Sequence, residues 1–178
     1  MHETRGFKHM SIQMNRVVTM MNTHVSLRAA DKTDLPAING VIERAIMTWR
    51  LPERVKRLSL PLYRYSEMDL GHLEVCVAEA GGQITALAAW EPAEAADLPE
   101  GCRGLLLHGL YVDPVHQRQR IGAQLLAACV TQARELGLDG VLVKAQADAE
   151  AFFRGQGLER LEVRDESRDY ALRYWHWA

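Results

Sequence analysis

Residues 105–136 read LLLHGLYVDPVHQRQRIGAQLLAACVTQAREL, and this stretch decides the fold. Its first eight residues form an apolar run typical of a buried strand, which Asp113-Pro114 breaks. A loop rich in basic and amide side chains follows, and the remaining residues have the apolar spacing of a helix. The first N–H groups of a helix lack partners within it and carry partial positive charge. We therefore expect the turn between this strand and this helix to bind a phosphate group.

A second strand follows the helix closely. Gly137 stands where a helix C-cap belongs, and residues 140–144 (GVLVK) form a short apolar run that suits a strand buried on both faces. A strand, a helix and a strand joined by short links imply a right-handed parallel crossover.

Outside this crossover the pattern favours antiparallel pairing. Residues 24–29 and 73–80 alternate as strands, and Gly81-Gly82 predicts a hairpin that returns along residues 84–90. Two helices are expected between the first two strands, because apolar residues recur there at helical spacing.

After the crossover we expect one short helix and two more strands, residues 158–164 and 170–177. The predicted fold class is α/β, an α+β mixed sheet of about seven mostly antiparallel strands with one parallel crossover and about four helices. The chain is expected to consist of an N-terminal extension, residues 1–23, and one domain, residues 24–178.

Composition narrows the classes of function. The chain has 178 residues and a net charge of −2, so its overall charge offers no electrostatic reason to bind nucleic acid or an anionic membrane. It contains no apolar run long enough for a transmembrane helix. Its 3 cysteines are widely spaced, which argues against a disulfide framework or a zinc site. We expect a reduced, cytoplasmic protein without a metal.

The central stretch resembles a known family. Tyr111-Val112-Asp113-Pro114 followed by Gln117-Arg118-Gln119-Arg120-Ile121-Gly122 is similar to the acyl-CoA motif of the GNAT acetyltransferase superfamily, Gln/Arg-x-x-Gly-x-Gly/Ala. The following GVLVK and ADAEAFFRGQGLERL, and the order of elements upstream, extend the resemblance over residues 24–177. Arg120 replaces the middle glycine of the motif. That glycine lets the loop backbone approach the pyrophosphate closely, so the replacement bears on the loop geometry.

The resemblance implies a GNAT fold and the transfer of an acetyl group from acetyl-CoA, the cosubstrate, to a primary amine by direct attack. The amine could belong to a small molecule or to a protein or peptide. The residues that match the family's cofactor site lie at the strand end, in the loop and after the crossover. They are Leu110, Tyr111, Val112, Gln117, Arg118, Gln119, Arg120, Ile121, Gly122, Ala123, Gln146, Phe152 and Phe153.

His108 is the candidate general base, because it is the only group in the run Leu105 to Val112 that ionises near neutral pH, which suits proton removal from an amine. The alternative is a core histidine bonded to a backbone carbonyl. Gly109 suits a β-bulge that would turn residues 110–112 towards the pantetheine arm.

The family often supplies a tyrosine as general acid for the departing thiolate, but that position is Phe153 in this chain. Either Tyr111 or Tyr174 provides the hydroxyl, or the thiolate leaves without help.

The acceptor is not defined by the sequence. Aromatic side chains that could contribute to its site are Trp49, Tyr63, Tyr65, Trp90, Tyr174 and Trp175. An acyl-CoA-binding or sensor module with little turnover is the alternative function. An unrelated nucleotide-binding protein would need a glycine-rich loop after the first strand, and HVSLRAADKTD has none. Family analogy favours a homodimer.

Overall fold

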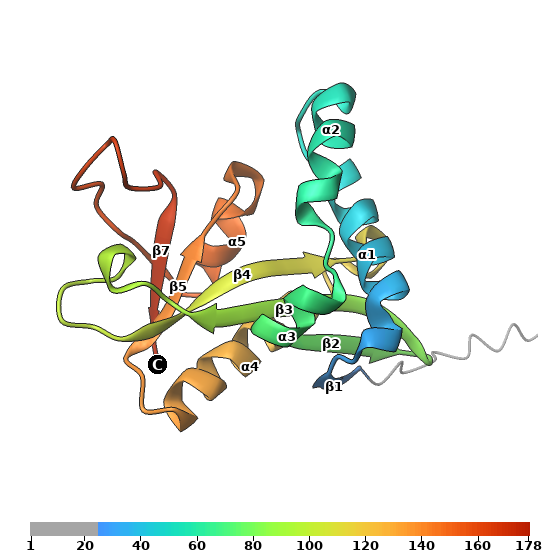
Figure 1. Cartoon of the computed structure of the whole chain (residues 1–178), viewed down its shortest axis with the longest axis horizontal. Helices are drawn as coiled ribbons and strands as arrows, with labels where there is room; N and C mark the ends of the chain where they lie inside the picture. The colour runs from blue at the N-terminus through green and yellow to red at the C-terminus, as the bar shows by residue number, and fades with distance from the viewer. Residues whose placement is uncertain (1–24) are drawn as a thin grey trace, which may run out of the picture.

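The computed structural model describes residues 25–178, so the extension predicted for residues 1–23 lies outside the described residues. Seven strands form one sheet in the order β1-β2-β3-β4-β5-β7-β6 (Figure 1). The strands are β1 (Ser26–Ala29), β2 (Glu74–Ala80), β3 (Gln83–Pro92), β4 (Gly104–Val112), β5 (Gly140–Lys144), β6 (Glu159–Arg160) and β7 (Arg173–Trp177). β4 and β5 pair in parallel, and the other neighbouring pairs are antiparallel. The predicted mixed sheet with one parallel crossover is confirmed.

Five helices accompany the sheet. They are α1 (Leu35–Met47), α2 (Glu53–Tyr63), α3 (Glu67–His72), α4 (Ile121–Glu135) and α5 (Glu150–Gly155). The sequence predicted about four. The additional helix is α3, which begins because Ser66 and Asp69 form a capping box directly after α2 has ended.

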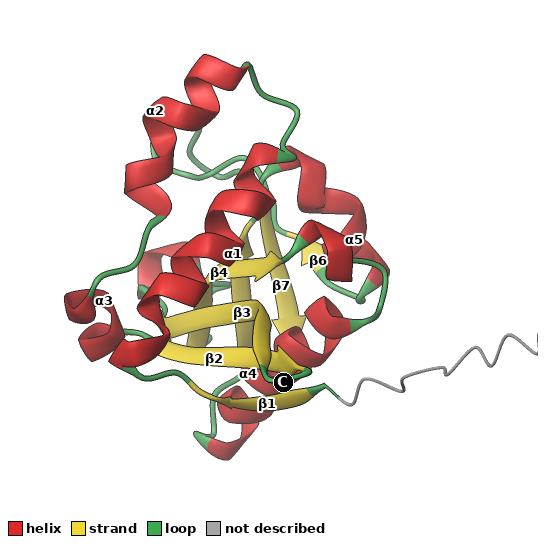
Figure 2. Cartoon of the chain, turned by 90° about the vertical axis from the view of Figure 1, so that its right-hand side faces the viewer, coloured by secondary structure: helices red, strands yellow, loops and turns green. Residues whose placement is uncertain are grey.

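Alternation along the strands divides the core into two layers. In β3, Ala86, Ala88 and Trp90 pack in the layer that contains α4, whereas Leu87 and Ala89 pack in the layer that contains α1. This alternation is the period-two pattern of a strand with both faces covered. α1 and α4 consequently lie on opposite faces of the sheet, and α2 stands away from it (Figures 1 and 2).

The C-terminal strands are shorter than predicted. β6 contains only residues 159–160 and β7 begins at residue 173, where residues 158–164 and 170–177 were expected. The link between β6 and β7 is irregular because the Asp169 side chain binds main-chain groups within it. Its carboxylate accepts the N–H groups of Arg164 and Asp165 and pairs with Arg173 at 2.7 Å. These contacts satisfy backbone groups that a longer strand would have paired.

A helix that could span a bilayer is absent from residues 25–178, whose longest helix, α4, has 15 residues. The same residues contain no group of three or more His, Cys, Asp or Glu side chains arranged to hold a metal ion.

Candidate active site

β4 and β5 separate midway along β4. Their parallel pairing ends at Leu107, opposite Val143, whereas β4 continues beside β3 as far as Val112. The carboxyl-terminal half of β4 therefore has a strand neighbour on one edge only.

The main-chain groups in this half of β4 alternate between its two edges. The Asp113 N–H donates to Thr85 O on the β3 side at 2.8 Å. Because successive residues in a ladder turn their N–H and C=O groups to opposite edges, Leu110 and Val112 turn theirs to the β5 side. Gln117 Nε2 donates to Val112 O at 3.3 Å, which agrees with this direction. The gap between β4 and β5 is thus edged by backbone groups of two predicted cofactor residues.

A β-bulge interrupts β4 next to this gap. Ala89 of β3 lies opposite Gly109, but the next residue, Trp90, lies opposite Leu107, which leaves His108 as the extra residue. The bulge predicted at Gly109 is present.

The bulge places two consecutive residues on one face of the sheet. Leu107 and Leu110 both pack with the α4 layer, so His108 and Gly109 between them fall on the opposite face, with α1. A Cβ at Gly109 would lie 2.6 Å from Tyr65 Oη, an atom of that second layer. Glycine is required at this position because the tyrosine occupies the space.

His108 is a partly exposed side chain, with 48% of its surface accessible. Its Nδ1 lies 3.5 Å from Glu91 Oε1, and its ring centroid is 6.3 Å from that of Tyr65. This position does not fit the alternative of a core histidine. Glu91, which the sequence reasoning did not select, is held near His108 because β3 and β4 are neighbours.

Tyr65 is held firmly beside the bulge. Its N–H donates to Asn39 Oδ1 at 2.8 Å, and Asn39 Nδ2 donates back to Tyr65 O at 2.9 Å. The residue is only 8% exposed, and its hydroxyl has no hydrogen-bond partner among the described residues. Burial, with smaller contributions from neighbouring groups, raises the pKa of this phenol well above its ordinary value.

The loop between β4 and α4 has an unusual backbone. Arg118 and Arg120 have φ values of 63° and 62°, in the left-handed region, while Gln119 between them is not among the residues of positive φ. Such alternation turns successive N–H groups towards one side, which creates a concavity suited to an anion. α4 begins immediately afterwards at Ile121.

Arg120 adopts the conformation that a glycine would adopt without strain. A non-glycine residue in this region costs roughly 1–2 kcal/mol. The replacement noted in the sequence therefore preserves the turn and adds strain to it.

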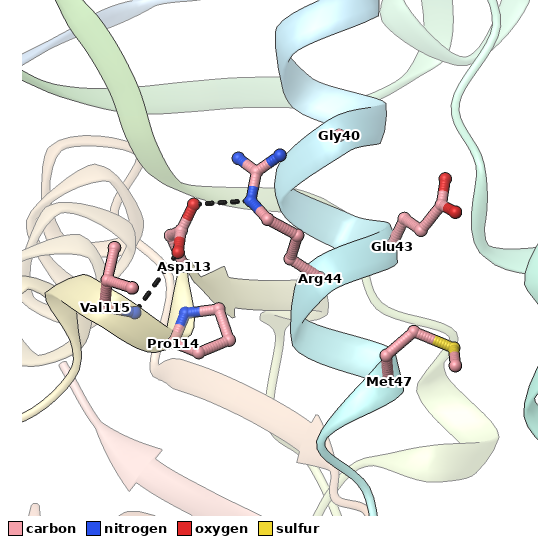
Figure 3. Close-up of a pocket in the computed structure, with 7 residues that line it drawn as sticks. All are labelled: Gly40, Glu43, Arg44, Met47, Asp113, Pro114 and Val115. Carbon is pink, nitrogen blue, oxygen red and sulfur yellow. Dashed lines mark hydrogen bonds and ion pairs between the residues drawn. The ribbon is translucent and has the colours of Figure 1, made fainter. Parts of the chain in front are cut away.

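An ion pair between the buried carboxylate of Asp113 and the half-exposed guanidinium of Arg44 anchors the start of this loop (Figure 3). Arg44 Nε on α1 donates to Asp113 Oδ2 at 2.7 Å, and the Val115 N–H donates to Asp113 Oδ1 at 3.2 Å. A cavity of about 510 Å³ adjoins the pair; it is lined by Gly40, Glu43, Arg44, Met47, Asp113, Pro114 and Val115. The sequence did not single out Arg44, because nothing in the spacing of α1 indicates a partner 69 positions later.

The start of α4 packs closely on the segment after β5. A Cβ at Gly122 would lie 3.3 Å from Phe152 Cζ and 3.5 Å from Val112 Cγ2. Phe152 also meets Phe153 edge to face at 5.1 Å, and Phe153 is buried. Glycine in the first turn thus lets three predicted cofactor residues come together.

Gln146 lies across from the α1–α2 region. Its Nε2 donates to Tyr63 Oη at 3.4 Å, and Tyr63 packs edge to face on Trp49 at 5.2 Å. The Arg50 N–H donates to Asp148 Oδ2 at 2.8 Å nearby. The segments that follow α1 and β5 are therefore joined near the open end of the gap.

Several aromatic candidates lie elsewhere. Tyr111 and Tyr174 are buried in opposite core layers, Trp90 lies in the α4 layer, and Trp175 packs with Leu142 in a third cluster. Of the six aromatic residues considered for the acceptor, Trp49, Tyr63 and Tyr65 belong to the α1 layer.

Comparison with known proteins agrees with this geometry. The acetyltransferase (GNAT) domain family matches residues 71–159, half of the chain. An L-methionine sulfoximine/L-methionine sulfone acetyltransferase of Salmonella typhimurium is 29% identical over 117 residues, which are 64% of this chain and 66% of that relative. This match therefore spans slightly less than two thirds of the relative's length.

Solved structures share the fold. The PaiA N-acetyltransferase of Thermoplasma acidophilum, in complex with coenzyme A, has a TM-score of 0.69 at 12% identity, covering 87% of this chain and 99% of that one. A GNAT family acetyltransferase of Brucella melitensis, in complex with acetyl-CoA, has a TM-score of 0.57 at 21% identity, covering 86% and 97%.

The chain belongs to the GNAT acetyltransferase family. The family and class of enzyme predicted from the central stretch are confirmed, as is the GNAT fold.

Proposed function

We propose that this protein transfers the acetyl group of acetyl-CoA to a primary amine by direct attack. The observation that carries the proposal is the gap beside β4, edged by the backbone of Leu110 and Val112 and ending at the concave loop of residues 117–120. A linear cofactor with a phosphate-bearing end matches this shape. The related structures named above hold coenzyme A or acetyl-CoA.

The pyrophosphate would be held by main-chain N–H groups of residues 117–123. The helix dipole of α4 adds partial positive charge at this end, and no side chain caps the helix start. The guanidinium groups of Arg118 and Arg120 are exposed beside the loop and suit charge-assisted hydrogen bonds to phosphate oxygens.

The pantetheine arm would lie along the gap. The backbone of Leu110 and Val112 would bond its amides, and Gln146 and Phe152 would contact it from the side of β5. Phe153 is buried and would support Phe152 from behind. The Leu110 N–H is our candidate for polarising the thioester carbonyl, a contribution of about 2.7–4 kcal/mol for a well-placed donor.

The acceptor would approach from the α1 side, where His108 is exposed at the bulge. His108 would accept a proton from the ammonium group so that the free amine attacks the thioester carbon. Glu91 would orient the imidazole and stabilise its protonated form, as a carboxylate partner does for other catalytic histidines.

The thiolate would leave without a tyrosine acid. Tyr111 and Tyr174, the two hydroxyls considered from the sequence, are both buried in the core. A thiol such as that of a cysteine side chain has an ordinary pKa of about 8.5, far below that of an alcohol, so a thiolate is a tolerable leaving group near neutral pH.

The alternative is a module that binds acyl-CoA with little turnover. The buried Phe153 at the usual acid position favours it. Two measurements separate the candidates: thermal stabilisation by coenzyme A and acetyl-CoA, and thiol release across a panel of amines. Stabilisation with turnover supports transfer, and stabilisation without turnover on any amine supports the module. A protein that millimolar acetyl-CoA fails to stabilise would exclude both.

Two further proposals concern the setting of the protein. Free Cys76, Cys102 and Cys129 support a reduced, cytoplasmic location. Assembly as a homodimer rests on family analogy, and light scattering of the purified chain tests it.

A further inference from the structure

Lys144, the last residue of β5, lies beside the candidate base. Leu106 of β4 is opposite Leu142 of β5 in the parallel ladder, and both pack in one cluster on the face of the sheet away from α4. Two residues further along each strand, and therefore on the same face, are His108 and Lys144. The paired part of the ladder has ended one residue earlier, so the gap begins between an imidazole on β4 and an ammonium on β5.

The Lys144 ammonium has hydrogen-bond donors to spare. Its Nζ donates to Asp97 Oδ2 at 2.7 Å, and no other acceptor for it is found among residues 25–178. An ammonium carries three donors, so a ligand can take up those that remain. The lysine side chain is 36% exposed, which makes these donors accessible. An ion pair this exposed adds little stability, so a carboxylate of a ligand can share the ammonium with Asp97 or replace that partner.

Arg173, by contrast, is a cation that holds the structure together. It lies opposite Lys144 in the antiparallel pair of β5 and β7, is buried, and forms an ion pair with Asp169 at 2.7 Å. Its Nη1 donates to Asp97 O at 3.3 Å, and the next residue, Leu98, packs on the sheet in the cluster described above. The loop between β3 and β4 is therefore fixed against β7 (Figure 1), and Asp97 is held beside Lys144. Of the two cations, Lys144 is the one that a ligand can reach.

The two sides of the gap carry opposite charges. On the β4 side, Glu91 Oε1 lies 3.5 Å from His108 Nδ1, and this pair suits an ammonium group that is to lose a proton. On the β5 side, Lys144 suits a carboxylate. Neighbouring strands are about 4.7–4.9 Å apart where they pair, so the two strands begin to separate from about that spacing. A small molecule whose amine and carboxylate are a few bonds apart spans it, as an amino acid does.

We propose that Lys144 binds a carboxylate of the acceptor and so selects a small zwitterionic amine, of the amino-acid type, whose amino group His108 deprotonates. Lys144 is then a specificity-determining residue, and Arg173 is a positioning residue that acts through Asp97. This inference rests on the proposed acetyl transfer and specifies its substrate class and the side chain that recognises it.

The test compares pairs of acceptors that differ only in the carboxylate. L-methionine sulfone is paired with 3-(methylsulfonyl)propan-1-amine, and L-tyrosine with tyramine. The kcat/KM of each is measured by thiol release on the full chain with saturating acetyl-CoA, and the preference ratio is that of the amino acid to its partner amine. We expect this ratio to be at least about ten in the better pair, since a hydrogen bond between charged groups is lost without the carboxylate.

Two variants of the ion pair should change the ratio in opposite directions. Lys144→Met removes the ammonium, so KM for the amino acid should rise and the ratio should fall by about tenfold, and Lys144→Arg should retain part of it. Asp97→Asn removes the competing carboxylate, so the ratio should rise severalfold. A pair that only held the loop in place would give the same change in both variants. The matched control is Lys32→Met, an exposed lysine near Glu67, which should leave the ratio unchanged.

Each outcome is decisive. Equal or faster turnover of the amines without a carboxylate would overturn the inference while leaving acetyl transfer intact. A ratio that is unchanged in Lys144→Met, or that falls equally in Lys144→Met and Asp97→Asn, would also overturn it. Thermal stabilisation by coenzyme A shows that each variant is folded. If no acceptor turned over in a protein that coenzyme A stabilises, the proposed transfer function would fail and this inference with it.

Discussion

On the cofactor side of β4 most of the candidate site is one continuous segment, residues 110–123, to which Gln146 and Phe152 are added, whereas on the acceptor side His108 lies among groups from two other segments. Tyr65 lies between α2 and α3, and Glu91 belongs to β3. The cofactor side can be described by its own backbone: a strand end, two left-handed residues and a helix start. The acceptor side depends on a tertiary contact, because Tyr65 packs over Gly109 at the bulge of β4. Binding of the cofactor and choice of the acceptor should therefore respond to different substitutions.

The largest expected effect separates chemistry from cofactor binding. His108→Ala should reduce kcat by about 10²–10⁴-fold, the usual contribution of a general base, with little change in the KM for acetyl-CoA. Steady-state kinetics with both substrates varied measures this. His116→Ala in the loop is the matched control and should leave kcat unchanged. An unaltered kcat in His108→Ala would remove His108 from the mechanism.

A larger side chain at Gly122 should weaken the binding of coenzyme A. In Gly122→Val the added side chain would press on Phe152 Cζ, which lies 3.3 Å from the Cβ position. Overpacking of this kind costs about 1–3 kcal/mol, so the Kd for coenzyme A should rise by one to two orders of magnitude. Calorimetric titration checks this. Gly122→Ala should bind almost normally, since the family motif admits alanine; equal affinity in Gly122→Val would contradict the close approach.

A side chain at Gly109 should destabilise the fold on the acceptor side of β4. A Cβ in Gly109→Ala would lie 2.6 Å from Tyr65 Oη, and the Asn39 hydrogen bonds prevent Tyr65 from moving freely. We expect a loss of about 1–3 kcal/mol in the free energy of unfolding, measured with urea. Adding Tyr65→Phe should restore part of it. Gly71→Ala on α3 meets no atom within 4 Å and should not destabilise.

Replacing Arg44 tests whether α1, on the face of the sheet opposite α4, helps to hold the loop between β4 and α4. Arg44→Gln leaves the buried Asp113 carboxylate without its charged partner, so the KM for acetyl-CoA should rise about five- to tenfold while kcat changes little. Asp113→Asn in the same chain should recover part of the loss. The control is Arg64→Gln, which breaks an exposed ion pair with Glu43, a residue of α1 like Arg44. It should have no measurable effect on the KM for acetyl-CoA.

The smallest effect concerns the strained turn. Arg120→Gly relieves a left-handed arginine, so the free energy of unfolding without cofactor should rise by about 0.5–1 kcal/mol after allowing for the flexibility of glycine. Thermal unfolding without and with coenzyme A measures this. Stabilisation by coenzyme A should be weaker than in the unmodified chain if the guanidinium contacts phosphate. A less stable apo variant would show that Arg120 is not strained.

Much of the cofactor side was predictable because its geometry is local. Asp113-Pro114, the basic loop and the apolar stripe of α4 fall within a few residues of one another, and each acts on its neighbours. The bulge could also be anticipated, because Gly109 interrupts an otherwise apolar strand. The left-handed conformation of Arg120 could not be predicted from the residue itself, because arginine rarely adopts a positive φ angle.

The amino-acid sequence alone determined the order of the strands and of all helices except α3, the parallel crossover and the segment that resembles a GNAT cofactor site. Hydrophobic period, turn residues and helix caps act over a few residues and can be read without the fold. Only the tertiary structure decided that Tyr65 fills the space over Gly109, that Arg44 holds Asp113 and that Glu91 stands beside His108. These contacts join residues 17 to 69 positions apart, and their partners are set by sheet register and helix packing, which the local pattern does not specify.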